Sequence, residues 1–383
     1  MVVLFVATFL AACKQDAKQP ATDTAHPQPA AAPEVYLYIS TVNKLNLRDQ
    51  PNKNGQVVTQ LAEGEFVEGT GEVSPNKEEV MLRGITYLEP YFKVVTKEQK
   101  TGWAYSGALQ RIYTGSRTGI PDLEKISQLT GFLKTLDTKK LDSGKKAWDF
   151  VNANFANASG PLADAAFILL EEFLFRMERE GEYYTMTEKV QWANEDYQAI
   201  ADRKYDLNKN PVTKSLADNG FELNLGEGMV FPVVDWNKLN AFFEAKVTPA
   251  MKAFIAQETA EQNKQAWNDG GIIISLEELA DRAAFWEKFN RANPYFPRIE
   301  QTKESERWTR LVLVNGADNT PVSNYETNEI LEDYKKVWAY IQQKYPNTEL
   351  AKTTKEIADL CTAEGWKRTK KVEDWQAKYA EKN

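Results

Sequence analysis

The chain has 383 residues, enough for two or three domains, and a formal net charge of −8. No block of lysine and arginine alternates with aromatic residues, so we expect no nucleic-acid partner. The only histidine, His26, lies in a polar stretch near the N-terminus. This excludes a folded Ser-His-Asp or Cys-His catalytic site and a histidine-based zinc site. We therefore expect no catalytic residue of these types, no metal and no cofactor.

The first residues form an apolar run that ends in a cysteine. Val2 to Leu10 is followed by Ala11, Ala12 and Cys13. This pattern resembles the lipobox of bacterial lipoproteins, although no positive residue precedes the run. The resemblance implies a signal peptide over residues 1–12 and a lipid anchor on the Cys13 thiol. The alternative is a short buried helix, because spanning a bilayer takes about 20 apolar residues.

Residues 13–34 are rich in Ala, Pro, Gln, Thr and Asp and show no periodicity, which predicts a disordered tether. Such a tether would hold the folded part away from a membrane. Lys14 and Asp16, directly after Cys13, resemble the surface-export signal of some bacterial lipoproteins. We therefore expect a lipid-anchored protein of the cell envelope, with the outer membrane favoured and both periplasmic and surface exposure open.

Residues 35–113 predict a small antiparallel β-barrel, because short β-rich segments alternate with turns of Gly, Pro, Asn and Asp. Strands and turns close within this span, so we expect it to have its own core. The predicted strands cover residues 35–39, 45–48, 57–61, 66–71, 91–95 and 101–105.

This segment resembles the bacterial SH3 (SH3b) domain family. The resemblance rests on Leu45-Asn46-Leu47-Arg48, on Pro51, on the apolar strand that ends at Gly64, and on Gly102-Trp103-Ala104. It departs from the family at a long insertion over residues 74–90.

Domains of the SH3b family bind cell-wall peptides or proteins, which implies the same class of ligand here. No ligand residue can be transferred from the family position by position. The aromatic residues Trp103, Tyr105 and Tyr91 are the candidate ligand contacts, and packing inside the barrel is the alternative for Trp103.

From residue 118 to residue 383 the pattern is mostly helical, with a possible subdivision near residue 215. Residues 162–177 predict a buried core helix, and Pro161 suits its first turn. Further helical patterns cover 188–204 and 235–265, whereas glycines and alternating apolar residues over 219–232 predict a β-hairpin. The expected fold is thus α+β: a small SH3-like barrel followed by a mostly α-helical domain with a short hairpin.

An internal repeat ends the chain. Trp286 and Pro294 correspond to Trp338 and Pro346 at an offset of 52 residues. Each unit, over about 275–320 and about 327–372, predicts an aromatic helix, a proline break and a second helix, and resembles a tetratricopeptide-like hairpin. Ser275 begins the first unit as a capping box. Two visible copies are too few for a free-standing solenoid, so we expect them to pack on the preceding helices.

Three functional hypotheses follow. The leading one is a non-catalytic envelope lipoprotein whose SH3b module binds a cell-wall or protein ligand and whose helical domain mediates protein interaction. The second is a carboxylate-dependent wall or glycan hydrolase, which would need two acids that converge from different elements. The third is a structural scaffold in which the SH3b domain serves only for packing. Cys361 lies in a helical apolar pattern and is predicted to be a buried hydrophobic side chain rather than a reactive thiol.

Overall fold

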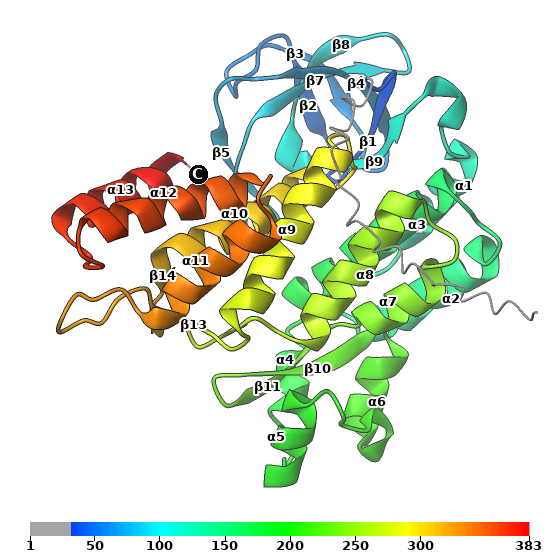
Figure 1. Ribbon diagram of the computed structural model, residues 1–383. Helices are drawn as coiled ribbons and strands as arrows, with labels where there is room; N and C mark the ends of the chain where they lie inside the picture. The colour runs from blue at the N-terminus through cyan, green and yellow to red at the C-terminus, as the bar shows by residue number, and fades with distance from the viewer. Residues whose placement is uncertain (1–31, 383) are drawn as a thin grey trace, which may run out of the picture. The chain divides into compact units, whose positions relative to one another are not determined.

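The N-terminal part of the folded chain is an antiparallel seven-stranded sheet. The computed structural model describes residues 32–382, and the sheet has the order β3-β2-β8-β7-β4-β1-β9 (Figure 1). All six strands predicted from the sequence are present. The strands are β1 (Val35–Ser40), β2 (Leu45–Arg48), β3 (Val57–Leu61), β4 (Phe66–Val73), β7 (Tyr91–Thr96), β8 (Thr101–Tyr105) and β9 (Leu109–Gly115).

The insertion over residues 74–90 forms a β-hairpin of its own, which the sequence analysis did not predict. Its strands are β5 (Glu78–Leu82) and β6 (Ile85–Glu89), and Leu82 pairs with Ile85 across a two-residue turn. Both turn residues, Arg83 and Gly84, have positive φ angles of 51° and 81°. Positive φ at both positions is typical of a type I′ turn, whose twist matches that of the flanking strands.

Strand β1 is buried on both faces, so the sheet and the helices share apolar contacts. Tyr38 belongs to the core of the sheet, together with Leu47, Leu61 and Val94. On the other face, side chains of β1 and β9 belong to the main helical core instead; they are Val35, Leu37, Ile39, Ile112 and Tyr113. The side chains on this face of the sheet are therefore buried by the helices and not by the sheet's own core.

The helical part begins with a mixed region around one long central helix. Pro161 occupies the first turn of that helix, α3, as predicted, and its apolar face supplies much of the main core. The α-helices of this region are α1 (Leu123–Leu133), α2 (Asp142–Phe155), α3 (Pro161–Glu180), α4 (Tyr184–Thr187), α5 (Asn194–Ala201), α6 (Pro211–Asp218), α7 (Trp236–Phe243) and α8 (Pro249–Asn263). Short 3-10 helices cover η1 (Ser106–Ala108), η2 (Arg117–Gly119) and η3 (Leu207–Lys209).

The predicted hairpin over 219–232 is confirmed as β10 (Phe221–Gly226) and β11 (Met229–Val234). Two helical predictions were too long. Only residues 194–201 of the segment 188–204 are helical. The segment 235–265 divides into α7 and α8, because Thr248 caps a new helix that begins at Pro249.

Two helical hairpins follow, at the offset that the sequence predicts. Trp286 and Trp338 are both fully buried and lie on the first helix of each hairpin. The helices are α9 (Leu276–Ala292), α10 (Ile299–Asn315), α11 (Glu332–Lys344), α12 (Glu349–Ala363) and α13 (Lys370–Lys382). Small two-residue strands form β12 (Trp267–Asn268) with β13 (Gly271–Ile272) and β14 (Gly316–Ala317) with β15 (Thr320–Pro321). Within residues 32–382, no helix combines the length and apolarity that a membrane span requires.

Candidate functional site

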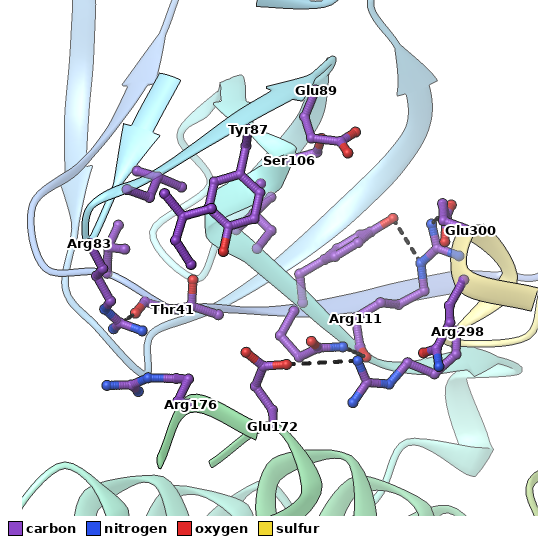
Figure 2. Close-up of a pocket in the computed structure, with 18 of the residues that line it drawn as sticks. Thr41, Arg83, Tyr87, Glu89, Ser106, Arg111, Glu172, Arg176, Arg298 and Glu300 are labelled. Carbon is purple, nitrogen blue, oxygen red and sulfur yellow. Dashed lines mark hydrogen bonds and ion pairs between the residues drawn. The ribbon is translucent and has the colours of Figure 1, made fainter. Parts of the chain in front are cut away.

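A cavity of about 330 Å³ lies where the inserted hairpin, the sheet and two helices meet (Figure 2). The hairpin contributes the inward-facing side chains of β6, and η1 and β9 contribute the side of the sheet. Helix α3 and the residues around the start of α10 close the other side. The volume falls in the range of small-molecule sites, which are typically about 300–1,000 Å³.

Five arginines line this cavity, and they come from four different parts of the chain. Arg83 lies in the hairpin turn, Arg111 on β9, Arg176 and Arg179 on α3, and Arg298 directly before α10. Figure 2 shows four of them, with Tyr87 of the hairpin entering the same space. A cluster of guanidinium groups around a cavity favours an anionic ligand, because each group offers several donors in a fixed plane.

Helix α3 presents a stripe of alternating charge to the cavity. Glu172, Arg176, Arg179 and Glu180 all line it, as the helical spacing of three to four residues allows. Arg179 lies 3.6 Å from Glu172 and Arg176 lies 3.7 Å from Glu180, between nitrogen and oxygen. These ion pairs are long, and within the described residues the buried Nε atom of Arg176 has no hydrogen-bond partner. Burial, together with the positive charge of Arg83, lowers the pKa of Arg176.

Arg83 lies in the hairpin turn, across the cavity from helix α3, and its contacts hold it in position. Its Nη2 donates to the backbone oxygen of Thr41 and lies 3.1 Å from Glu63 Oε1. Arg83 occupies the left-handed region of φ, which is uncommon for a residue other than Gly, Asn or Asp. The Arg83 side chain therefore runs from the turn back to Thr41 of the sheet domain and lines the cavity together with residues of α3.

Arg111 forms the right-hand wall in Figure 2. Its Nε donates to the Tyr38 hydroxyl at 3.2 Å and its Nη2 donates to Glu300 Oε1 at 3.0 Å. Only 10% of the Arg111 side chain is exposed. Arg111 therefore fixes the sheet to the start of α10, and its donors are already satisfied by protein groups.

The three aromatic residues proposed from the sequence do not lie together on a surface. Tyr91 and Tyr105 are buried in the core of the sheet, where their rings meet at a centroid distance of 5.4 Å. Neither ring offers an open face to a ligand, because burial covers both. Trp103 is partly exposed, with Lys93 Nζ 5.8 Å from its ring centroid, and it does not line the arginine cavity.

Tyr105 nevertheless shapes one wall of the cavity, because its hydroxyl group holds the inserted β5–β6 hairpin in place. Its hydroxyl lies 2.9 Å from the Glu78 oxygen and 2.7 Å from the Tyr87 oxygen, and it accepts from the Glu89 amide at 3.1 Å. These partners lie on both strands of the hairpin. The residue predicted to touch a ligand thus positions the wall of the site instead.

The two cysteines have different positions relative to the described structure. Cys13, the predicted lipidation site, lies outside the described residues 32–382. Cys361 is fully buried on α12, and burial raises the pKa of its thiol to about 11. The prediction that Cys361 is a buried hydrophobic side chain is confirmed.

A second cavity, of about 380 Å³, collects acids from two helices. Glu178 of α3 faces Glu258 and Glu261 of α8 there, beside Trp236 and Trp267. Glu178 accepts from the Val234 amide at 2.8 Å, and Glu261 accepts from Trp286 Nε1 at 2.9 Å. Burial raises the pKa of Glu258 to about 8, helped by the nearby charges of Glu261 and Glu171. Acids from different elements therefore do converge in this part of the protein.

Within residues 32–382, no group of three or more His, Cys, Asp and Glu side chains is arranged to hold a metal ion. No protein family, no curated protein and no solved structure matches the chain.

Proposed function

We propose that the chain is a membrane-anchored, non-catalytic binding protein of the bacterial cell envelope. The observation that supports this most directly is the arginine-lined cavity at the junction of sheet and helices. In this proposal the sheet is an SH3-like barrel whose inserted hairpin, β5–β6, forms one wall of the ligand site. The helical hairpins from α9 onward form a tetratricopeptide-like surface for protein partners.

The resemblance of residues 35–113 to SH3b domains makes a cell-wall peptide or an envelope protein the expected ligand class. The guanidinium groups of Arg83, Arg176 and Arg179 line the cavity, and such groups hold acidic ligand groups through charge-assisted hydrogen bonds. Trp103, on the partly exposed face of β8, is a second candidate contact for a larger ligand.

Retention of the purified protein on peptidoglycan sacculi tests the proposal. Ile85 faces the cavity and is 38% exposed, whereas Leu88 points to the opposite face of the same hairpin and is 54% exposed. We expect Ile85→Trp to fill the cavity mouth and abolish retention, and Leu88→Trp to leave it unchanged. Equal retention of both variants would contradict a binding role for the cavity, and no retention of the unaltered protein would favour the scaffold hypothesis.

The anchoring part of the proposal depends on Cys13. We expect Cys13→Ser to move the protein from the membrane pellet to the soluble fraction, because a lipid chain contributes about 0.8 kcal/mol per buried methylene. Metabolic labelling with a clickable fatty acid provides the direct measurement. An unlabelled native protein would contradict lipidation.

The acidic cavity supports a second candidate, a carboxylate-dependent glycan hydrolase. The specific observation is that Glu258, with its pKa raised to about 8, shares a cavity with Glu178 and Glu261. A protonated and an ionised carboxyl group are what glycoside hydrolysis requires. Release of soluble fragments from peptidoglycan, abolished by Glu258→Gln, would support this function. The absence of any turnover would reject it.

A further inference from the structure

Building on the proposed binding role of the cavity, we propose that its ligand carries a single carboxylate, held between Arg83 and Arg176, and an apolar group that packs against the inserted hairpin. Both arginines line this cavity and also an adjoining one of about 260 Å³. They therefore face the same space, one from the hairpin turn and one from α3. Thr41 and Gln110 line both cavities as well and add neutral polar groups, and the acid Glu172 also lines both.

Arg176 carries a buried donor that no protein group satisfies. Its closest acid, Glu180, is 3.7 Å away, and its Nε is buried without a hydrogen-bond partner among residues 32–382. The Nε of Arg298 is likewise unpartnered, but the Nη2 of Arg298 donates to the Glu171 carboxylate, as Nη2 of Arg111 donates to Glu300. A buried donor without a partner costs free energy until a ligand or water supplies an acceptor. An anion beside Arg176 supplies that acceptor and offsets the repulsion from Arg83.

The inserted hairpin brings Arg83 to the same space from the other side. Arg83 and Gly84 form its two-residue turn with positive φ angles of 51° and 81°. Arg83 donates to the backbone oxygen of Thr41, which also lines the cavity, so this contact keeps the Arg83 side chain at the cavity.

The acids around the cavity limit the charge of the ligand that it can hold. Four glutamates line it beside the five arginines, and Arg83 and Arg298 are also paired with Glu63 and Glu171. Much of the arginine charge is thus compensated within the protein, so a carboxylate adds less uncompensated negative charge to this partly buried space than a phosphate dianion does.

The opposite wall of the cavity is apolar. Leu82, Ile85 and Phe92 line it, together with the ring of Tyr87 and the side chain of Leu109. The ligand class is therefore a monocarboxylate with an apolar neighbour, such as the carboxyl end of a peptide or an acyl chain. Burial of the apolar part would contribute affinity, and the arginine pair would fix its orientation.

Titration of the purified full-length protein with N-acetyl-leucine, followed by calorimetry and ligand-observed NMR, tests this proposal. N-acetyl-leucinamide is the matched neutral probe, hexanoate is the acid without a peptide group, and inorganic phosphate is the more highly charged anion. We expect the acid to bind about tenfold more tightly than the amide, since charge-assisted hydrogen bonds are roughly twice as strong as neutral ones. Hexanoate binding as tightly as N-acetyl-leucine would assign an acyl chain, and weaker hexanoate binding would assign a peptide carboxyl end.

Arg176→Gln and Arg83→Gln should each remove the preference for the acid over the amide, and Arg176→Lys should retain part of it. Arg117→Gln is the control, because it removes one positive charge at an exposed ion pair with Glu68, outside the cavity. Thermal unfolding of each variant shows whether it is folded. If Arg176→Gln does not fold, Arg83→Gln still tests the proposal, because Arg83 lies in an exposed turn. Equal affinity for acid and amide, or tighter binding of phosphate, would overturn the carboxylate proposal. If Ile85→Trp abolishes retention on sacculi, the cavity is still supported as a binding site even when the carboxylate proposal fails. The proposed binding function and the carboxylate proposal are therefore tested independently.

Discussion

Glu171 on α3 and Arg298 before α10 form a buried ion pair beneath the arginine cavity. The two residues are far apart in sequence, and their side chains are only 4% and 12% exposed. Arg298 also lies at the N-cap of α10, where the helix dipole disfavours a positive charge. Glu171 therefore provides the compensation that allows Arg298 to occupy this position. The pair links the central helix to the repeat region and gives the cavity a fixed floor.

Arg298→Met should destabilise the protein, because it leaves the Glu171 carboxylate buried without a partner. We expect a loss of about 3 kcal/mol in the free energy of unfolding at about pH 8, and a smaller loss at about pH 5, where Glu171 takes up a proton. Chemical denaturation at both pH values gives these differences. The double variant Arg298→Met with Glu171→Leu should recover most of the loss, and a double variant as unstable as the single one would contradict this account.

Glu258 should make stability fall as pH rises. Its pKa is raised from 4.5 to about 8 in the folded protein, so between these values the folded state binds a proton that the unfolded state lacks. This contribution is complete below pH 4.5 and is lost as pH rises through about 8. Glu258→Gln should therefore gain stability relative to the unaltered protein at alkaline pH, on the order of 5 kcal/mol. Parallel pH profiles of the two proteins in urea denaturation would contradict the assignment.

Tyr105→Phe should loosen the inserted hairpin while leaving the rest of the sheet intact. The phenol group holds backbone atoms on both β5 and β6, and its loss should cost about 1–2 kcal/mol. Hydrogen exchange should increase over residues 78–89, and retention on sacculi should weaken. Tyr113→Phe is the matched control, since it removes a tyrosine hydroxyl bond to the Ser116 oxygen in the same sheet, away from the hairpin. Equal exchange in the two variants would rule out a specific role for Tyr105.

The isolated sheet, residues 32–116, should not unfold cooperatively. Removal of the helices exposes Val35, Leu37, Ile39 and Ile112, which are at most 3% exposed in the whole chain. Each such side chain contributes about 1.5–3 kcal/mol when buried, which together rivals the total stability of a small domain. Circular dichroism during heating provides the test. A sharp transition in the isolated sheet would show that its inner core, around Leu47 and Val94, is sufficient.

The sequence alone determined the local elements with strong periodicity. Alternating apolar residues and turn residues placed the strands of the sheet, and the apolar face from residue 162 to 177 with Pro161 at its start placed α3. The 52-residue offset placed Trp286 and Trp338 at corresponding buried positions. In each case the signal is short-range, because hydrophobic periodicity reports which face of an element is buried.

Only the tertiary structure decided where the site lies. Arg83, Arg111, Arg176 and Arg298 carry no common motif, and they meet because the inserted hairpin folds over the sheet beside α3. The Arg83-Gly84 turn between two alternating segments was the one local signal that could have revealed this hairpin. The burial of Tyr91 and Tyr105 could not be predicted from the sequence either. An aromatic residue in a strand packs inward or outward according to the neighbours that the fold places beside it.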